Sequence, residues 1–161
     1  MYKERNSSMG LFDAFKSEPP KLSPRMALTL GLLYMMASDG EIEAEEIGQL
    51  QSVVGRDQDL INNAVKYLRS VKYEQFLTEA AALLNESQKL CLLINMADSL
   101  LSDGRAEQSE QQAFGKALTQ FGMTEDGFKV YFETLVIKNN RSVFNWSKVR
   151  LKPFEKIRDW V

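Results

Sequence analysis

A short acidic motif occurs twice in this chain, and its repetition restricts the folds that the chain can adopt. The sequence SDGEIEAEE at 38–46 returns as SDGRAEQSE at 102–110, which lies 64 positions further along. A run of apolar residues precedes each copy, and an amphipathic segment follows it. Each copy therefore predicts an apolar helix, a turn and a helix with an acidic start. We expect an internally duplicated helical hairpin whose two apolar helices lie in the centre of the core.

The remaining sequence also follows a helical period. No segment shows the alternation of a strand or the turn signal of a β-hairpin. Ser23 is a suitable N-cap, and Pro24 fits the first position of a helix. Asn85 and Gln88 form a capping pair, and Thr124 is a further N-cap. The sequence therefore predicts an all-α fold of about seven or more helices. The predicted helices cover 24–39, 43–54, 57–71, 73–85, 86–104, 107–122, 125–140 and a short segment near 153–161.

The chain of 161 residues has the length of one ordinary domain. Residues 1–22 read as a tail and a proline-rich linker, and 23–140 as one helical domain. Residues 141–161 form a C-terminal extension with six basic residues, two acidic ones and interleaved aromatic residues. Such a pattern binds single-stranded nucleic acid in some proteins. Because the rest of the chain is acidic, we instead expect this extension to pack on the domain or to form a partner interface.

The composition argues against most enzyme classes. The chain contains no histidine, which excludes the usual zinc enzymes and Ser-His or Cys-His catalysis. It also has no glycine-rich phosphate loop or nucleophile elbow. The single cysteine cannot form an internal disulfide and favours the cytoplasm, and the net charge of −2 does not favour nucleic acid. We therefore expect a non-enzymatic, cytoplasmic protein that is not embedded in a membrane.

Several apolar side chains are expected to be core residues and not ligands. The methionines within the apolar helices fill space in most proteins, and a cysteine in the middle of such a helix is usually a small buried hydrophobe. The second helix should turn a stripe inward at Leu50 and its apolar neighbours. The residues that we expect to be buried on these grounds are Met26, Met35, Met36, Met96, Cys91, Ile47, Leu50, Val53 and Val54.

The acidic residues of the two motifs differ in how easily a helix accounts for them. Glu43, Glu46, Glu107 and Glu110 lie where helices begin, and the positive end of the helix dipole accommodates them without a metal. Asp39 and Asp103 instead follow the negative ends of the two apolar helices. Bound Ca²⁺ or Mg²⁺, which prefer oxygen ligands, would relieve that repulsion, and so would plain exposure to water. A weaker candidate ligand is Asp98, a charge within the second apolar helix.

A standard EF-hand does not fit these motifs. With Gly40 at the sixth position of the calcium loop, Met35 and Ala37 would occupy the first and third positions, and neither side chain can bind calcium. The second copy would place Ser99 and Leu101 there. Any metal site must therefore draw its ligands from more than one helix.

The pattern A-x-D-G-E-I-x-x-E-E after an apolar helix, with a related motif in a second hairpin, resembles the TerB-like family of tellurite-resistance proteins. The resemblance covers roughly 23–140. It implies an all-helical domain that is associated with chemical stress, binds a divalent cation and docks protein partners. By position it assigns the metal to Asp39, Glu46, Asp103 and Glu110. Weaker candidates, which the resemblance does not assign, are Glu43, Glu107 and Asp98. The second copy departs from the pattern, because Arg105 stands where the first copy has Glu41.

Two other functions fit the same residues. The first is a metal-free helical adaptor for protein partners, in which the acids serve only as helix caps. A carboxylate-metal hydrolase is the second alternative, and it would need a deep pocket with converging carboxylates. Whether the two turns form one site or two, and how many copies of the chain assemble, does not follow from the sequence.

Overall fold

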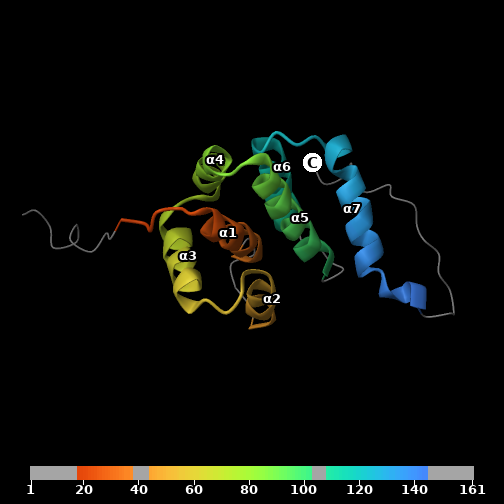
Figure 1. The fold of residues 1–161 in the computed structure, drawn as a ribbon, viewed down its shortest axis with the longest axis horizontal. Helices are drawn as coiled ribbons and strands as arrows, with labels where there is room; N and C mark the ends of the chain where they lie inside the picture. Colours follow the sequence, from red (N-terminus) through yellow and green to blue (C-terminus); the bar gives the residue numbers. More distant parts are fainter. Residues whose placement is uncertain (1–17, 38–43, 103–107, 145–161) are drawn as a thin grey trace, which may run out of the picture.

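The computed structural model describes residues 18–37, 44–102 and 108–144, and it confirms the all-α class (Figure 1). No strand occurs within these ranges, and no helix in them is long and apolar enough to cross a membrane. The turns at 38–43 and 103–107, the N-terminal 17 residues and the last predicted helix lie outside them. The helices are α1 (Pro24–Met36), α2 (Ala44–Val54), α3 (Gln58–Ser70), α4 (Tyr73–Leu83), α5 (Glu86–Ser102), α6 (Gln108–Gln120), α7 (Glu125–Asn139) and the short 3-10 helix η3 (Arg141–Phe144).

The predicted caps confirm where several helices begin. The Ser23 side chain accepts a hydrogen bond from the backbone N–H of Met26 at 3.3 Å, and Pro24 follows it at the first helical position. The backbone N–H of Asn85 donates to Gln88 Oε1 at 3.0 Å, and the N–H of Gln88 donates back to Asn85 Oδ1 at 2.9 Å. This reciprocal pair satisfies two donors that the helix cannot satisfy itself.

The α1 helix is the centre of the fold, as its sequence predicts. It packs against α2, α3, α4, α5 and α6, and Figure 1 shows it between α3 and α5. The predicted core methionines on α1 and α5 are all buried, with at most 3% of each side chain exposed. Helix α5 is the second hub, because it contacts α1, α6 and α7. The first residues of α2 and α6 are 64 positions apart, which matches the spacing of the repeated motif. The duplication of the hairpin itself stays a prediction.

A glycine allows α1 and α5 to approach closely. A Cβ atom added at Gly31 would lie 2.4 Å from Leu92 Cδ1, a side chain that is 1% exposed. The Leu92 side chain can lie this near to the backbone of α1 only because residue 31 has no side chain of its own. The contact between the two apolar helices thus depends on this residue.

Two residues that we expected to be buried are exposed, and these predictions are wrong. Cys91 is exposed on α5, because the buried side of that helix runs through Leu92, Leu93, Met96 and their neighbours. Val53 is 42% exposed, because α2 packs mainly against α1 and buries only a narrow stripe that includes Leu50. In both cases one side of the helix is left uncovered by its neighbours, which the composition of the helix does not reveal.

An aromatic cluster joins α1, α3 and α4. The ring of Tyr34 stacks on Phe76 at 5.0 Å and lies 5.1 Å from Tyr73, measured between ring centroids. The hydroxyls of the cluster all have acceptors: Tyr34 donates to Val71 O at 2.6 Å, Tyr73 to Ala113 O at 2.7 Å and Tyr67 to Glu79 Oε2 at 2.5 Å. The cluster therefore combines apolar burial with satisfied hydrogen bonds.

Substitution of Gly31 tests the close contact of α1 with α5. We expect Gly31→Val to lower the free energy of unfolding by about 1–3 kcal/mol, since the new methyl groups must displace the packed Leu92 side chain. Gly48→Val is the matched control, because nothing lies within 4 Å of a Cβ at that exposed position of α2. Urea denaturation followed by circular dichroism measures both. Equal effects of the two substitutions would contradict the proposed contact.

The tyrosine cluster predicts a loss of stability in alkali. Burial raises the pKa of Tyr34, Tyr67 and Tyr73, and the charge of Glu79 raises the pKa of Tyr34 and Tyr67 further. The folded state therefore holds the hydroxyl protons more tightly than the unfolded chain does. The contribution of these tyrosines to the free energy of unfolding is complete below about pH 10 and is lost as the pH rises above it. The urea midpoint should fall in that range, and less steeply in the Tyr67→Phe variant. Tyrosinate absorbance that corresponds to all five tyrosines of the chain near pH 10, without unfolding, would contradict this.

Candidate cation site

Four of the predicted ligands lie outside the described residues, namely Asp39, Glu43, Asp103 and Glu107. Three others are described. Glu46 lies near the start of α2 and Glu110 in the first turn of α6, and both are half-buried. Their positions confirm the prediction that these two acids lie at helix N-termini, where the dipole favours them. Asp98 lies on α5, one turn before its end.

A small cleft opens where α1, α2 and α5 meet. Its volume is about 110 Å³. Gln49 Nε2, on α2, donates to Ser102 Oγ, on α5, at 2.9 Å and ties the two helices together across it. The lining residues are Leu32, Met36, Gln49, Ser52, Val53, Asn95, Asp98, Ser99 and Ser102.

The cleft brings together the ends of the two apolar helices. Met36 is the last residue of α1, Ser102 is the last residue of α5, and both line the cleft. These are the residues from which the chain enters its two acidic turns. The lining is largely polar on the side of α5, with hydroxyl, amide and carboxylate groups from Asn95, Asp98 and Ser99. Oxygen atoms of this kind suit a hard cation or a hydrogen-bonding partner.

Asp98 reaches the cleft and is also held by the far end of α7. Lys138 Nζ forms an ion pair with Asp98 Oδ2, and Asn139 Nδ2 donates to Asp98 Oδ1 at 2.7 Å. Both carboxylate oxygens therefore have a donor. The Asp98 side chain is 29% exposed and that of Lys138 59%, so the pair is partly shielded from water. A lysine ammonium thus already balances this charge in the structure.

The described residues hold no group of three acidic, cysteine or histidine side chains that could bind a metal by itself. A site at this cleft would therefore need acids from the two turns. Sequence reasoning missed Lys138, Asn139 and Gln49 as neighbours of the cleft. The one available signal was that Lys138 is the basic residue in the last turn of α7.

A second depression lies between α1 and α5, nearer the starts of these two helices than the first cleft. Pro24, Arg25, Leu28, Leu84, Gln88, Cys91 and Leu92 line it. Arg25 is already engaged, since it forms a 2.9 Å ion pair with Asp57 and donates to Val54 O at 3.1 Å. Asn95 Nδ2 donates a hydrogen bond of 3.6 Å to the exposed Cys91 thiol at its edge. The residues that line the depression include no acid and no second thiol.

Comparisons with protein-family models, with curated proteins and with solved structures gave no match to this chain. The TerB-like resemblance therefore rests on the residues of the two motifs.

Removing the Asp98 carboxylate tests the link between α5 and α7. We expect Asp98→Ala to lower the free energy of unfolding by about 1–3 kcal/mol, because Lys138 and Asn139 both lose a charge-assisted partner. Glu86→Ala is the control. Glu86 pairs with Lys89 at 2.8 Å, but its side chain is 86% exposed, and exposed pairs contribute only about 0–1 kcal/mol to the free energy of unfolding. A double-mutant cycle with Lys138→Met isolates the ion pair. An Asp98→Ala effect no larger than that of the control would contradict the link.

Proposed function

We propose that this chain is a non-enzymatic, stress-associated helical module of the TerB-like kind that binds one divalent cation between its two acidic turns. One observation supports a shared site above all others: Met36 and Ser102, which end α1 and α5, line the same cleft. Asp39 follows Met36 by three residues, and Asp103 follows Ser102 directly. Both candidate carboxylates are therefore tethered to this cleft by a short length of chain.

The electrostatics of the two turns favour a cation. Each turn follows the C-terminal end of a helix, where the last carbonyl groups carry partial negative charge. Two such ends and their carboxylates repel one another when no cation is present. An ion such as Ca²⁺ or Mg²⁺ would replace that repulsion with attraction and join the two hairpins. Binding energy of this kind adds to the stability of the folded state.

The small size of the cleft supports a binding role over hydrolysis. Pockets that hold a small-molecule ligand usually measure about 300–1,000 Å³. The cleft among the described residues is about 110 Å³, which suits an ion with its water ligands or a single side chain of a partner. Tellurite is an anion, and acidic turns would repel it. Protection against tellurite would then act indirectly, through the partners that the module docks.

The ion pair of Asp98 favours a second function, that of a helical adaptor that binds no metal. Lys138 places an ammonium group on the one carboxylate that the described part of the cleft contains. If internal cations balance the other acids in the same way, the site needs no metal. The cation dependence of stability separates the two functions.

Divalent cations should stabilise the protein, because they bind the folded state and not the unfolded chain. After treatment with chelator, addition of Ca²⁺ or Mg²⁺ at a hundred times its dissociation constant should raise the free energy of unfolding by about 2.7 kcal/mol. Thermal melts of the full chain in chelator and then in millimolar salt measure the shift. No shift with either ion would favour the adaptor.

Variants in the two turns distinguish one site from two. If the turns share one ion, Asp39→Asn and Asp103→Asn should each abolish most of the shift, because either change removes a ligand of the same site. Two separate sites would leave about half of the shift in each variant. Asp59→Asn, at an exposed position in the first turn of α3, is the matched control and should keep the full shift.

A further inference from the structure

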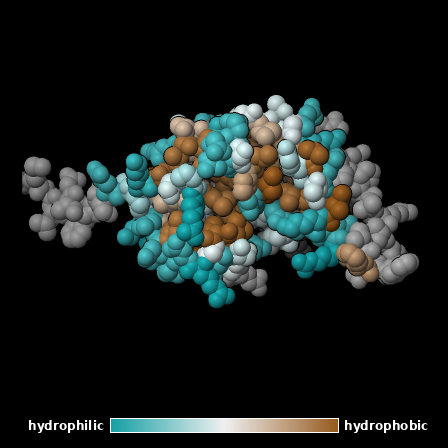
Figure 2. Space-filling view, in the orientation of Figure 1, coloured by the Kyte–Doolittle hydropathy of each residue, from teal (hydrophilic) through white to brown (hydrophobic). Residues whose placement is uncertain are grey.

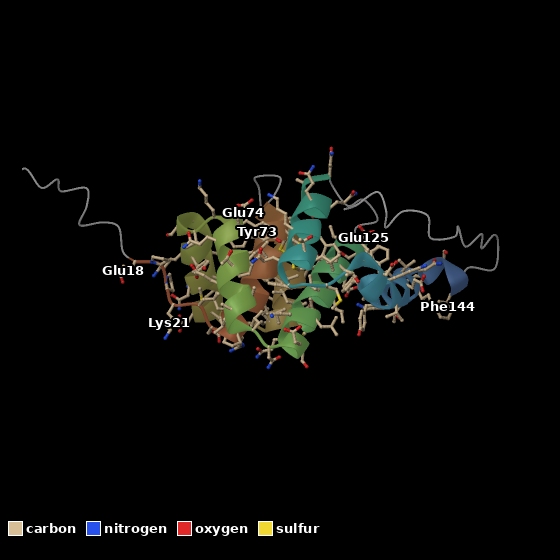
Figure 3. The ribbon with its side chains drawn as sticks, turned by 90° about the horizontal axis from the view of Figure 1, so that it is seen from above. Glu18, Lys21, Tyr73, Glu74, Glu125 and Phe144 are labelled. Atoms are coloured by element: carbon tan, nitrogen blue, oxygen red, sulfur yellow. The ribbon has the colours of Figure 1, made fainter. Side chains whose placement is uncertain are left out.

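The outer side of α7 carries an apolar stripe that no other described helix covers. Val130 is 59% exposed and Ile137 is 70% exposed. They are seven residues apart, a spacing that places them on the same side of a helix. Beyond the end of α7, Phe144 is 82% exposed. Figure 2 shows hydrophobic surface over α7, and Figure 3 shows Phe144 beyond its end, far from Glu18.

The position of α7 explains why the stripe is free. Among the described helices α7 packs mainly against α5, with its buried side at Phe128, Phe132 and Leu135. Figure 1 shows α7 at the edge of the molecule. The side away from α5 therefore meets no helix within the described residues. It keeps Val130 and Ile137 exposed to water, and Phe144 is exposed just beyond the end of α7.

The chain itself supplies a segment that matches this stripe. Residues 145–161 follow Phe144 directly and contain Trp146, Phe154, Ile157 and Trp160. The same segment is rich in lysine and arginine, while α7 begins with Glu125 and Asp126. A segment that runs back along α7 would bring its basic residues toward these acids. Apolar and charged groups are thus complementary on the two sides.

The length of the segment is sufficient for this path. From Phe144 back to Glu125 the distance along a helix is about 28 Å, at 1.5 Å per residue. Seventeen residues span up to about 56 Å when extended. An extended or partly helical segment can therefore reach the acidic start of α7, whereas seventeen residues in a single helix, about 26 Å long, would fall slightly short of it.

The small area of the stripe favours an attached segment over a separate molecule. A stable interface between two proteins usually involves about 20–30 residues on each side. Three exposed apolar side chains are far fewer. A segment joined to the end of α7 needs much less area, because its effective concentration is in the millimolar range. We propose that residues 145–161 bind along the outer side of α7 and cover Val130, Ile137 and Phe144.

The two tryptophans of the chain, Trp146 and Trp160, allow a direct test, because both lie in the proposed segment. In the unsubstituted chain we expect the two tryptophans to emit at short wavelength and to be protected from quenching by acrylamide. Ile137→Asp should lower the docking equilibrium about tenfold, since it removes the burial of one large apolar side chain. Emission should shift to longer wavelength and quenching should rise. Val130→Asp should act in the same direction.

A control and a dilution series make the result specific. Leu83→Asp changes an apolar side chain of α4 that is 41% exposed, and it should leave the tryptophan signal unchanged. Circular dichroism verifies that each variant stays folded. Tryptophans that are quenched freely in the unsubstituted protein would overturn the proposal. So would protection that survives both α7 variants, or protection that disappears on dilution, which would assign the stripe to a second molecule.

Discussion

The packing of α1 against α5 is the contact on which the rest of the structure depends. Gly31 lets the Leu92 side chain approach the backbone of α1, and the remaining helices pack around this pair. Both helices carry many apolar side chains, and the burial of these side chains in the shared core stabilises the fold. Their close approach also decides where their ends lie. The cleft that Met36 and Ser102 share is a direct result of this packing.

The cleft has a different chemistry from the core beneath it. Core side chains around α1 are apolar and densely packed, whereas the cleft collects amides, hydroxyls and a carboxylate from α2 and α5. The hydrogen bond from Gln49 to Ser102 and the ion pair of Asp98 with Lys138 connect three helices around it. A cation in this place would act on α1, α2, α5 and α7 together. That arrangement suits a module whose shape or stability responds to an ion and which passes the response to a partner.

Local features could be predicted from the sequence, and distant contacts could not. The caps at Ser23, Asn85 and Thr124 depend on residues three positions away, so the sequence alone indicates them correctly. The exposure of Cys91 and Val53 depends on which neighbours cover each helix, and composition does not contain that information. The ion pair between Asp98 and Lys138 joins residues 40 positions apart. Of the candidate site, the sequence indicates the acids and their helix ends, while the cleft that connects them required the structure.

The position of a bound metal is the most direct test of a shared cation site. Crystals grown with Mn²⁺ as a substitute for Mg²⁺ would show the ion by its anomalous scattering. One peak per chain is expected, beside the cleft between the ends of α1 and α5, with oxygen ligands from both acidic turns. Two separate peaks, one at each turn, or no peak near the cleft at a saturating concentration would contradict it.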